Sequence, residues 1–146
     1  MSNLGTEISA TLRLAWTPVG AVIKDAGGKI KFPKLSTRGG LYRFSVRRID
    51  GSRAVYVGES DNIQRRFSHY RNPGQTQPTN IRINALFIAI LDRGGQVDVS
   101  VVTDMAWIKS ADQEEVADFR RKDIRRLFEN FVLVTQKAAE IEELNK

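Results

Sequence analysis

Residues 39–58 read GGLYRFSVRRIDGSRAVYVG, and the remaining elements can be placed outward from them. Apolar and polar residues alternate on both sides of Ile49-Asp50-Gly51, which predicts two strands, Leu41–Arg48 and Ser52–Gly58. The double glycine ahead of the first strand marks the point where this unit begins. We therefore expect an antiparallel β-hairpin here.

The register of this hairpin depends on the length of its loop. A two-residue Asp-Gly turn would place Tyr42 and Tyr56 on opposite faces of the hairpin. A three-residue loop, with Gly51 in the left-handed conformation as a G1 bulge, pairs Tyr42 with Gly58 and turns both tyrosines to one face. We predict the longer loop if the two tyrosines share a site.

Two helices, one further strand and a long helical region are expected after the hairpin. These are a helix capped by Ser60 and running to about Arg71, a helix capped by Thr79 and running from Asn80 to about Leu91, a strand over Val97–Val102, and a helical region from about Asp112 to Leu144, with a break near Lys122 left open. Apolar residues of the last region, from Val116 to Ile141, recur every three or four positions, as on the buried face of an amphipathic helix.

The first of these helices combines a buried stripe with polar neighbours. Ile63 and Phe67 lie four residues apart and should be buried. Arg66 and Tyr70 lie beside that stripe, so we expect them at the edge of the core. In that position an arginine and a tyrosine are able to face a ligand.

The order of these elements indicates a small α+β domain. Residues 36–146 would form it, with a three-stranded mixed or antiparallel sheet flanked by helices. Residues 1–35 read as an N-terminal β-hairpin arm around the turn Asp25-Ala26-Gly27-Gly28.

Composition excludes several classes of site. The 146 residues include no cysteine, which rules out disulfides, zinc fingers, thiol nucleophiles and iron–sulfur clusters. The single histidine, His69, rules out multi-histidine metal sites. No apolar run approaches the roughly 20 residues that span a bilayer, and the N-terminus lacks a signal-peptide pattern. We expect a cytoplasmic protein that does not bind membranes.

Positive charge is concentrated around the three tyrosines of the chain. Between Arg38 and Arg82 there are nine arginines and three acidic residues, so this segment carries the whole net charge of +6. Arginine suits phosphate because its planar guanidinium donates two parallel hydrogen bonds. The segment therefore indicates nucleic-acid binding, although a solvated basic surface has the same composition.

A metal ligand for such a site is available further along the chain. Glu129 interrupts the apolar run from Leu127 to Val134, where a carboxylate is costly unless a cation or hydrogen bonds compensate. One carboxylate with waters and phosphate oxygens is an ordinary Mg²⁺ site. Alternatively, Glu129 pairs with Arg125 or Arg126 one turn earlier.

Five sequence elements occur in a fixed order with defined spacing. They are Gly40-Leu41-Tyr42, Tyr56-Val57-Gly58 with 13 residues between the two tyrosines, Arg66 eight positions after Gly58, Tyr70 four positions later, and Leu127-Phe128-Glu129 followed by Phe131-Val132-Leu133. This set resembles the GIY-YIG nucleases over residues 39–134. The resemblance implies the GIY-YIG fold and a metal-dependent DNA endonuclease that hydrolyses phosphodiester bonds.

The same resemblance implies a role for each motif residue. Tyr42 or Tyr56 would be the general base for the attacking water, Arg66 would stabilise charge on the scissile phosphate, Tyr70 would hold the phosphate or a metal-bound water, and Glu129 would ligate one Mg²⁺ or Mn²⁺. Because the ordinary pKa of tyrosine is near 10, nearby cations would have to lower it by roughly two or three units, or the metal would have to acidify the water instead.

Contacts to DNA are expected from residues around this site and from the segment 79–84, which looks like a stretch found in members of the family. The candidates are Gly58, Arg65, His69, Arg71, Arg82 and Asn84. The basic run 120–126 would be a solvated helix face, with a role in tracking the DNA backbone left open.

Two positions depart from the family's pattern. Glu59 stands where some members have lysine, and Asn145 lies further from Glu129 than the family's late asparagine. No appended DNA-reading module is evident, so specificity would come from loops, the N-terminal arm, a homo-oligomer or a partner protein. The alternative from a different functional class is a non-catalytic nucleic-acid-binding module with the same fold.

Overall fold

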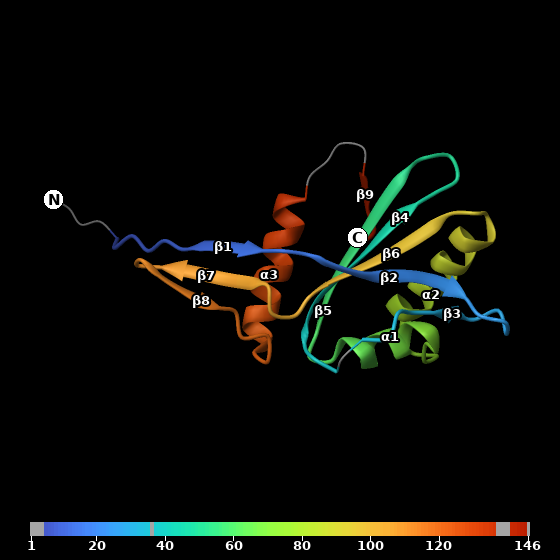
Figure 1. Cartoon of the computed structure of the whole chain (residues 1–146), viewed down its shortest axis with the longest axis horizontal. Coiled ribbons are helices and arrows are strands. Elements are labelled where there is room, and N and C mark those ends of the chain that lie inside the picture. The colour runs from blue at the N-terminus through green and yellow to red at the C-terminus, as the bar shows by residue number, and fades with distance from the viewer. Residues whose placement is uncertain (1–4, 36, 137–140, 146) are drawn as a thin grey trace.

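The computed structural model describes residues 5–35, 37–136 and 141–145. Within them lie a six-stranded sheet, a three-stranded sheet and three helices (Figure 1). In spatial order the larger sheet consists of β3 (Ile30–Lys31), β2 (Thr17–Lys24), β6 (Gln96–Val102), β4 (Gly40–Arg47), β5 (Arg53–Ser60) and β9 (Ile141–Glu143). The smaller sheet consists of β1 (Thr11–Leu14), β7 (Ala106–Ser110) and β8 (Gln113–Val116). The helices are α1 (Ile63–Arg71), α2 (Pro78–Asp92) and α3 (Lys122–Thr135).

The central hairpin has the register that a three-residue loop predicts. Tyr42 pairs with Gly58, and Phe44 pairs with Tyr56. Gly51 has a left-handed backbone with φ of +87°, and its N–H donates to the carbonyl of residue 48 over 2.9 Å. Tyr42 and Tyr56 therefore share one face of the sheet, which confirms the longer loop.

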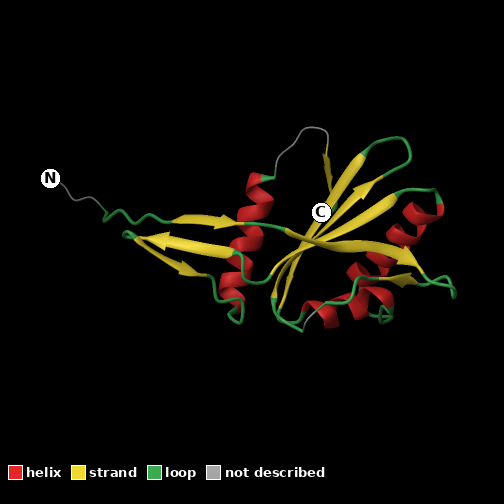
Figure 2. Ribbon diagram, viewed as in Figure 1, coloured by secondary structure: helices red, strands yellow, loops and turns green. Residues whose placement is uncertain are grey.

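A hydrophobic cluster lies on each face of the six-stranded sheet. Alternate residues of β4 and β5 point to opposite faces, as the period of two in a strand requires. The first cluster includes Tyr42, Phe44, Tyr56, Phe67 and Phe87, and the second includes Leu41, Val55, Val57, Phe128 and Val132. α1 and α2 cover the first face and α3 packs on the second (Figure 2).

The expected α+β class is confirmed, and the sheet is wider than three strands. The strands expected from sequence, β4, β5 and β6, form its antiparallel centre. β2 adds to β6, β3 adds to β2 beyond the expected turn at residues 25–28, and β9 adds to β5 in parallel. β3 and β9 have only two and three residues, too few for a hydrophobic period to reveal them.

Two helices begin at residues other than those predicted. α1 is capped by Asn62, whose side chain accepts from the Arg65 N–H over 2.9 Å, and not by Ser60. Ser60 is instead the last residue of β5, and its hydroxyl donates to the Asn62 carbonyl over 2.9 Å. α2 begins at Pro78 and includes Thr79, because proline is favoured in the first helical turn. None of the helices in the described residues is long and apolar enough to cross a bilayer.

The prediction of a helical region from Asp112 to Leu144 is wrong over much of its length. This part of the chain contains β8, a loop, α3 and β9. Ala111 and Asp112 have positive φ of 50° and 67°, which closes a tight hairpin between β7 and β8. Val116, expected on a buried helical stripe, is 60% exposed at the end of β8. The turn at Ala111 and Asp112 therefore forms a hairpin in this part of the chain, and the apolar spacing before Lys122 does not reflect a helix.

The three-stranded sheet projects from the body of the molecule (Figure 1). Arg13 of β1 pairs with Glu114 of β8 at 2.9 Å, across the intervening strand β7. The guanidinium of Arg13 also lies 3.9 Å from the ring centroid of Trp107 on β7. Side chains on one face thus tie the three strands together.

Replacement of Gly51 by alanine should destabilise the protein. A Cβ at Gly51 would meet nothing within 4 Å, so the effect should come from the left-handed backbone alone. We expect the free energy of unfolding to fall by about 1–2 kcal/mol, measured by urea denaturation. Gly27→Ala, in another exposed turn but without a left-handed φ, should change it little. Equal effects of the two substitutions would contradict the proposed bulge.

Candidate active site

The three tyrosines of the chain come together on one face of the six-stranded sheet. The hydroxyls of Tyr42 on β4 and Tyr70 on α1 are 2.7 Å apart and form a hydrogen bond. The ring centroid of Tyr56 on β5 lies 6.4 Å from that of Tyr70. Tyr70 is only 1% exposed, so the expectation that it lies at the edge of the core is wrong.

Gly58 provides the space that Tyr42 occupies. A Cβ on Gly58 would lie 2.3 Å from both Cζ and the hydroxyl oxygen of Tyr42. Any side chain at this position would therefore displace the ring from its place beside Tyr70. The glycine is required by the packing of Tyr42, whatever else approaches it.

Burial determines the protonation of Tyr42 and Tyr70. Removal from water raises the pKa of both phenols, and the neighbouring Tyr56 raises the pKa of Tyr42 further. The Tyr70 hydroxyl and the positive charge of Arg66 lower the pKa of Tyr42, but burial outweighs them. Tyr42 is therefore a neutral phenol at neutral pH, because the net shift of its pKa is upward. Of the two alternatives given above, a tyrosine pKa lowered by nearby cations is not met at this residue.

Arg66 and Glu129 reach Tyr42 from different helices. Arg66 on α1 and Glu129 on α3 are both partly buried. The charge of Arg66 lowers the pKa of Tyr42 and of Glu129, and the charge of Glu129 raises the pKa of Tyr42. The three groups thus lie within electrostatic range of one another, although α1 and α3 pack on opposite faces of the sheet.

The carboxylate of Glu129 lacks full compensation. Burial raises the pKa of Glu129, and the negative charge of Glu59 raises it further, against the opposing charges of Arg126 and Arg66. Arg125, one of the two arginines expected to pair with Glu129, pairs with Glu59 instead. Glu129 is therefore a group whose ionisation a bound cation would favour.

Sequence reasoning missed the buried ion pair between Glu59 and Arg125. Arg125 is 6% exposed; its Nε donates to Glu59 Oε1 over 2.8 Å and its Nη1 donates to the Phe119 carbonyl over 2.8 Å. Its position three residues before Phe128 and seven before Val132 places Arg125 on the buried stripe of α3. That spacing was the signal that separates Arg125 from the exposed arginines around it.

Several residues expected to contact DNA bind other parts of this chain. Arg65 pairs with Asp61 (2.7 Å), Arg71 with Asp25 (2.7 Å) and the Ile30 carbonyl (2.6 Å), Arg82 with the Leu144 carbonyl (3.0 Å), and Asn84 with the Tyr70 carbonyl (2.8 Å). His69 is partly buried on α1. These interactions hold α1 and α2 to neighbouring segments, and contact of these residues with DNA stays a prediction.

Asn145 closes part of the edge of β5. Its Oδ1 accepts from the Val57 N–H over 2.9 Å, and its Nδ2 donates to the Val57 carbonyl. Both ends of the amide are thus occupied by backbone directly before Gly58. No local pattern could have predicted this, because the two residues are 88 positions apart.

The carboxylates available to a metal are few. Across the described residues, no group of three or more His, Cys, Asp or Glu side chains is arranged to hold a metal ion. The negative charge of Glu59 nevertheless raises the pKa of Glu129. A cation beside Glu129 would offset both the cost of burying its charge and the repulsion from Glu59. Mg²⁺ is commonly held by one or two carboxylates with waters and substrate phosphates, so these residues fit it.

The chain therefore has a mixed α+β fold in which residues of the central hairpin, α1 and α3 lie within electrostatic range of one another. The solved structure of a mutant of EndoII from bacteriophage T4 has a similar fold, with a TM-score of 0.55 and 15% sequence identity. The similarity covers 82% of this chain and 87% of the EndoII chain. No protein-family model and no curated protein sequence matches the chain.

Removal of one hydroxyl from the Tyr42–Tyr70 pair should leave the other buried hydroxyl without this hydrogen bond. Tyr42→Phe leaves the buried Tyr70 hydroxyl without this partner, so the free energy of unfolding should fall by about 1–3 kcal/mol. The double variant with Tyr70→Phe should lose less than the sum of the two single losses, because neither hydroxyl is then stranded. Urea unfolding of the four proteins measures this coupling, and strictly additive losses would contradict it.

Glu129→Gln should stabilise the protein in metal-free buffer at pH 7. Because burial raises the pKa of Glu129 in the folded state, ionisation opposes folding, and this effect grows as pH rises through that pKa. The gain in thermal midpoint should therefore vanish below about pH 4, the ordinary carboxyl range. Glu115→Gln, on an exposed residue of β8, is the matched control for the loss of a carboxylate. A loss of stability at pH 7 would contradict the raised pKa.

Proposed function

We propose that this protein is a metal-dependent DNA endonuclease of the GIY-YIG type, which hydrolyses phosphodiester bonds with an activated water. The proposal is carried by one observation: the five motif residues, from β4, β5, α1 and α3, converge on a single site. They are Tyr42, Tyr56, Arg66, Tyr70 and Glu129. As its name indicates, EndoII is an endonuclease, and the shared fold supports the same class for this chain.

Arg66 is the proposed ligand of the scissile phosphate. Its guanidinium lies within electrostatic range of both Tyr42 and Glu129. A phosphate bound to Arg66 would therefore be close to both the tyrosines and the proposed metal ligand. The positive charge would stabilise the additional negative charge that develops on the phosphate oxygens in the transition state.

Tyr56 is the tyrosine that we propose to orient the attacking water and accept its proton. It is 9% exposed, more than either of the other two tyrosines, whose hydroxyls face each other. As a buried neutral phenol, Tyr42 would donate or accept hydrogen bonds without carrying charge. Tyr70 would fix the orientation of Tyr42 and of the phosphate.

Glu129 is the proposed ligand for one Mg²⁺ or Mn²⁺, with Glu59 as the neighbouring carboxylate. When bound, the metal would lower the pKa of a coordinated water and neutralise charge on the phosphate. Because burial raises the pKa of Tyr42, this phenol would stay neutral, and the proton of the water would pass to Tyr56. The ion pair with Arg125 would keep Glu59 in place beside it.

The substrate is proposed to be DNA because the nine arginines between Arg38 and Arg82 supply the whole net positive charge. Gly58, Arg65 and His69 lie on or beside the elements of the site and are proposed contacts. Sequence specificity is proposed to come from loops, the N-terminal arm, a second copy of the chain or a partner protein.

Cleavage of plasmid DNA with Mg²⁺ or Mn²⁺ tests the proposal directly. Wild type should cut, Arg66→Ala should slow cutting by about a hundredfold, and Glu129→Ala should abolish metal-dependent cutting. Arg93→Ala and Glu115→Gln, at exposed positions away from the site, should cut as wild type does.

Two outcomes would contradict the proposed activity or the proposed position of the active site. Metal-independent DNA binding without any cutting would leave the non-catalytic binding module as the function. Cutting that survives both Arg66→Ala and Glu129→Ala would place the active site elsewhere.

A further inference from the structure

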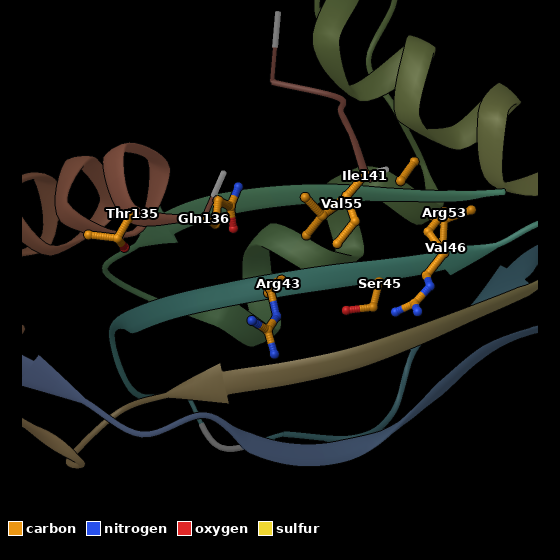
Figure 3. Close-up of a pocket in the computed structure, with 9 residues that line it drawn as sticks. Arg43, Ser45, Val46, Arg53, Val55, Thr135, Gln136 and Ile141 are labelled. Carbon is orange, nitrogen blue, oxygen red and sulfur yellow. The ribbon is translucent and has the colours of Figure 1, made fainter. Parts of the chain in front are cut away.

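A cavity lies on the face of the sheet opposite to the tyrosines. It has a volume of about 390 Å³ and is bounded by β4, β5, the end of α3 and the start of β9 (Figure 3). Its lining includes Arg43, Ser45, Arg53, Val55, Gln136 and Ile141. Arg43 follows Tyr42 directly in β4, so the alternation of the strand turns these two side chains to opposite faces.

Two hydrogen-bond donors in this cavity have no acceptor among the described residues. They are Nε of Arg43 and Nε2 of Gln136, and both atoms are buried. A buried donor without a partner costs free energy, so such atoms are rare in native proteins. The two residues that carry these donors both line this cavity, so a turn of either side chain would present its donor to an acceptor of a ligand bound there.

The charge of the cavity selects an anion. Two arginines, Arg43 and Arg53, line it, and neither has a carboxylate within 4 Å among the described ion pairs. By contrast, the buried Arg125 is paired with Glu59, and the partly buried Arg71 is paired with Asp25.

Arg43 is also held in position before any ligand binds. Its guanidinium carbon lies 4.4 Å from the ring centroid of Trp16, in a cation–π contact. This contact satisfies the flat face of the guanidinium and leaves its edge, where the N–H groups are, for hydrogen bonds. A planar guanidinium with a free edge is suited to phosphate.

The size and the apolar walls of the cavity indicate more than a bare phosphate. Cavities of about 300–1,000 Å³ accept organic ligands, and this one lies within that range. Val55 and Ile141 provide an apolar surface beside the two arginines. The Ser45 hydroxyl adds a polar group suited to a sugar.

We propose that this cavity binds a nucleoside phosphate, with the phosphate on Arg43, Arg53 and Gln136 and the nucleoside against Val55 and Ile141. The ligand is either a free nucleotide or one nucleotide of a DNA strand, since both present the same chemistry. The proposal requires binding only and does not depend on the chain being a nuclease.

Isothermal titration calorimetry in EDTA, where metal-dependent cutting cannot occur, tests this site. The probes are dCMP, inorganic phosphate and a single-stranded oligodeoxynucleotide. Arg43→Gln and, independently, Gln136→Met should each weaken binding about tenfold or more, because each removes a donor to the phosphate. Gln136→Met changes little volume, so it keeps the test valid if Arg43→Gln fails to fold.

Arg13→Gln provides the matched control. Arg13 also stacks on a tryptophan, Trp107, but it lies in the projecting sheet away from the cavity. Its replacement should change the affinity for each probe less than twofold.

The pattern across the probes identifies the source of the ligand. Binding of dCMP that both variants weaken supports the site with a free nucleotide, and binding of the oligonucleotide alone that both variants weaken supports it with a DNA strand. The proposal is overturned if wild type binds neither dCMP nor the oligonucleotide, or if the variants bind these probes as tightly as wild type. It is also overturned if inorganic phosphate binds as tightly as dCMP.

Discussion

The contact of the Tyr42 ring with Gly58 is the constraint on which the rest of the site depends. It requires a residue without a side chain at position 58, and it requires the three-residue loop that pairs these two positions. With that pairing, Tyr42 and Tyr56 share a face and Tyr70 can complete the buried cluster from α1. A slip of one residue would move every side chain of β5 to the other face and separate the tyrosines.

Compensation of charge is uneven across the molecule, and the exceptions coincide with the proposed sites. Arg125 and Glu59 are paired and buried, and Arg125 also binds a backbone carbonyl, so this pair acts as structural support. Glu129 is left with a raised pKa, and Arg43 with an unmatched donor. Proteins commonly retain such unfavourable groups where a ligand or a reaction needs them.

Features that depend on residues close together in the sequence could be predicted best. The loop at Gly51, the strands beside it and the buried positions Ile63 and Phe67 follow from turn residues and short-range periodicity. The region after Asp112 could not be predicted in the same way, because a left-handed turn at two non-glycine residues is not visible in hydrophobic spacing. The partners of Glu59 and of Val57 depend on tertiary contacts, which no window of sequence contains.

The hydrogen bonds of Asn145 to the Val57 backbone also affect the order in which the chain folds. The Val57 backbone finds its partner 88 residues later, and β9 pairs with β5 across a similar separation. Contacts between such distant residues form slowly, because a long loop must close before they contribute. The β4–β5 hairpin can therefore form early from its own turn, whereas the edge of β5 beside Gly58 is completed only when the C-terminal segment returns. The edge of β5 beside Gly58 is thus expected to reach its final geometry after the tyrosines of β4, β5 and α1 have come together.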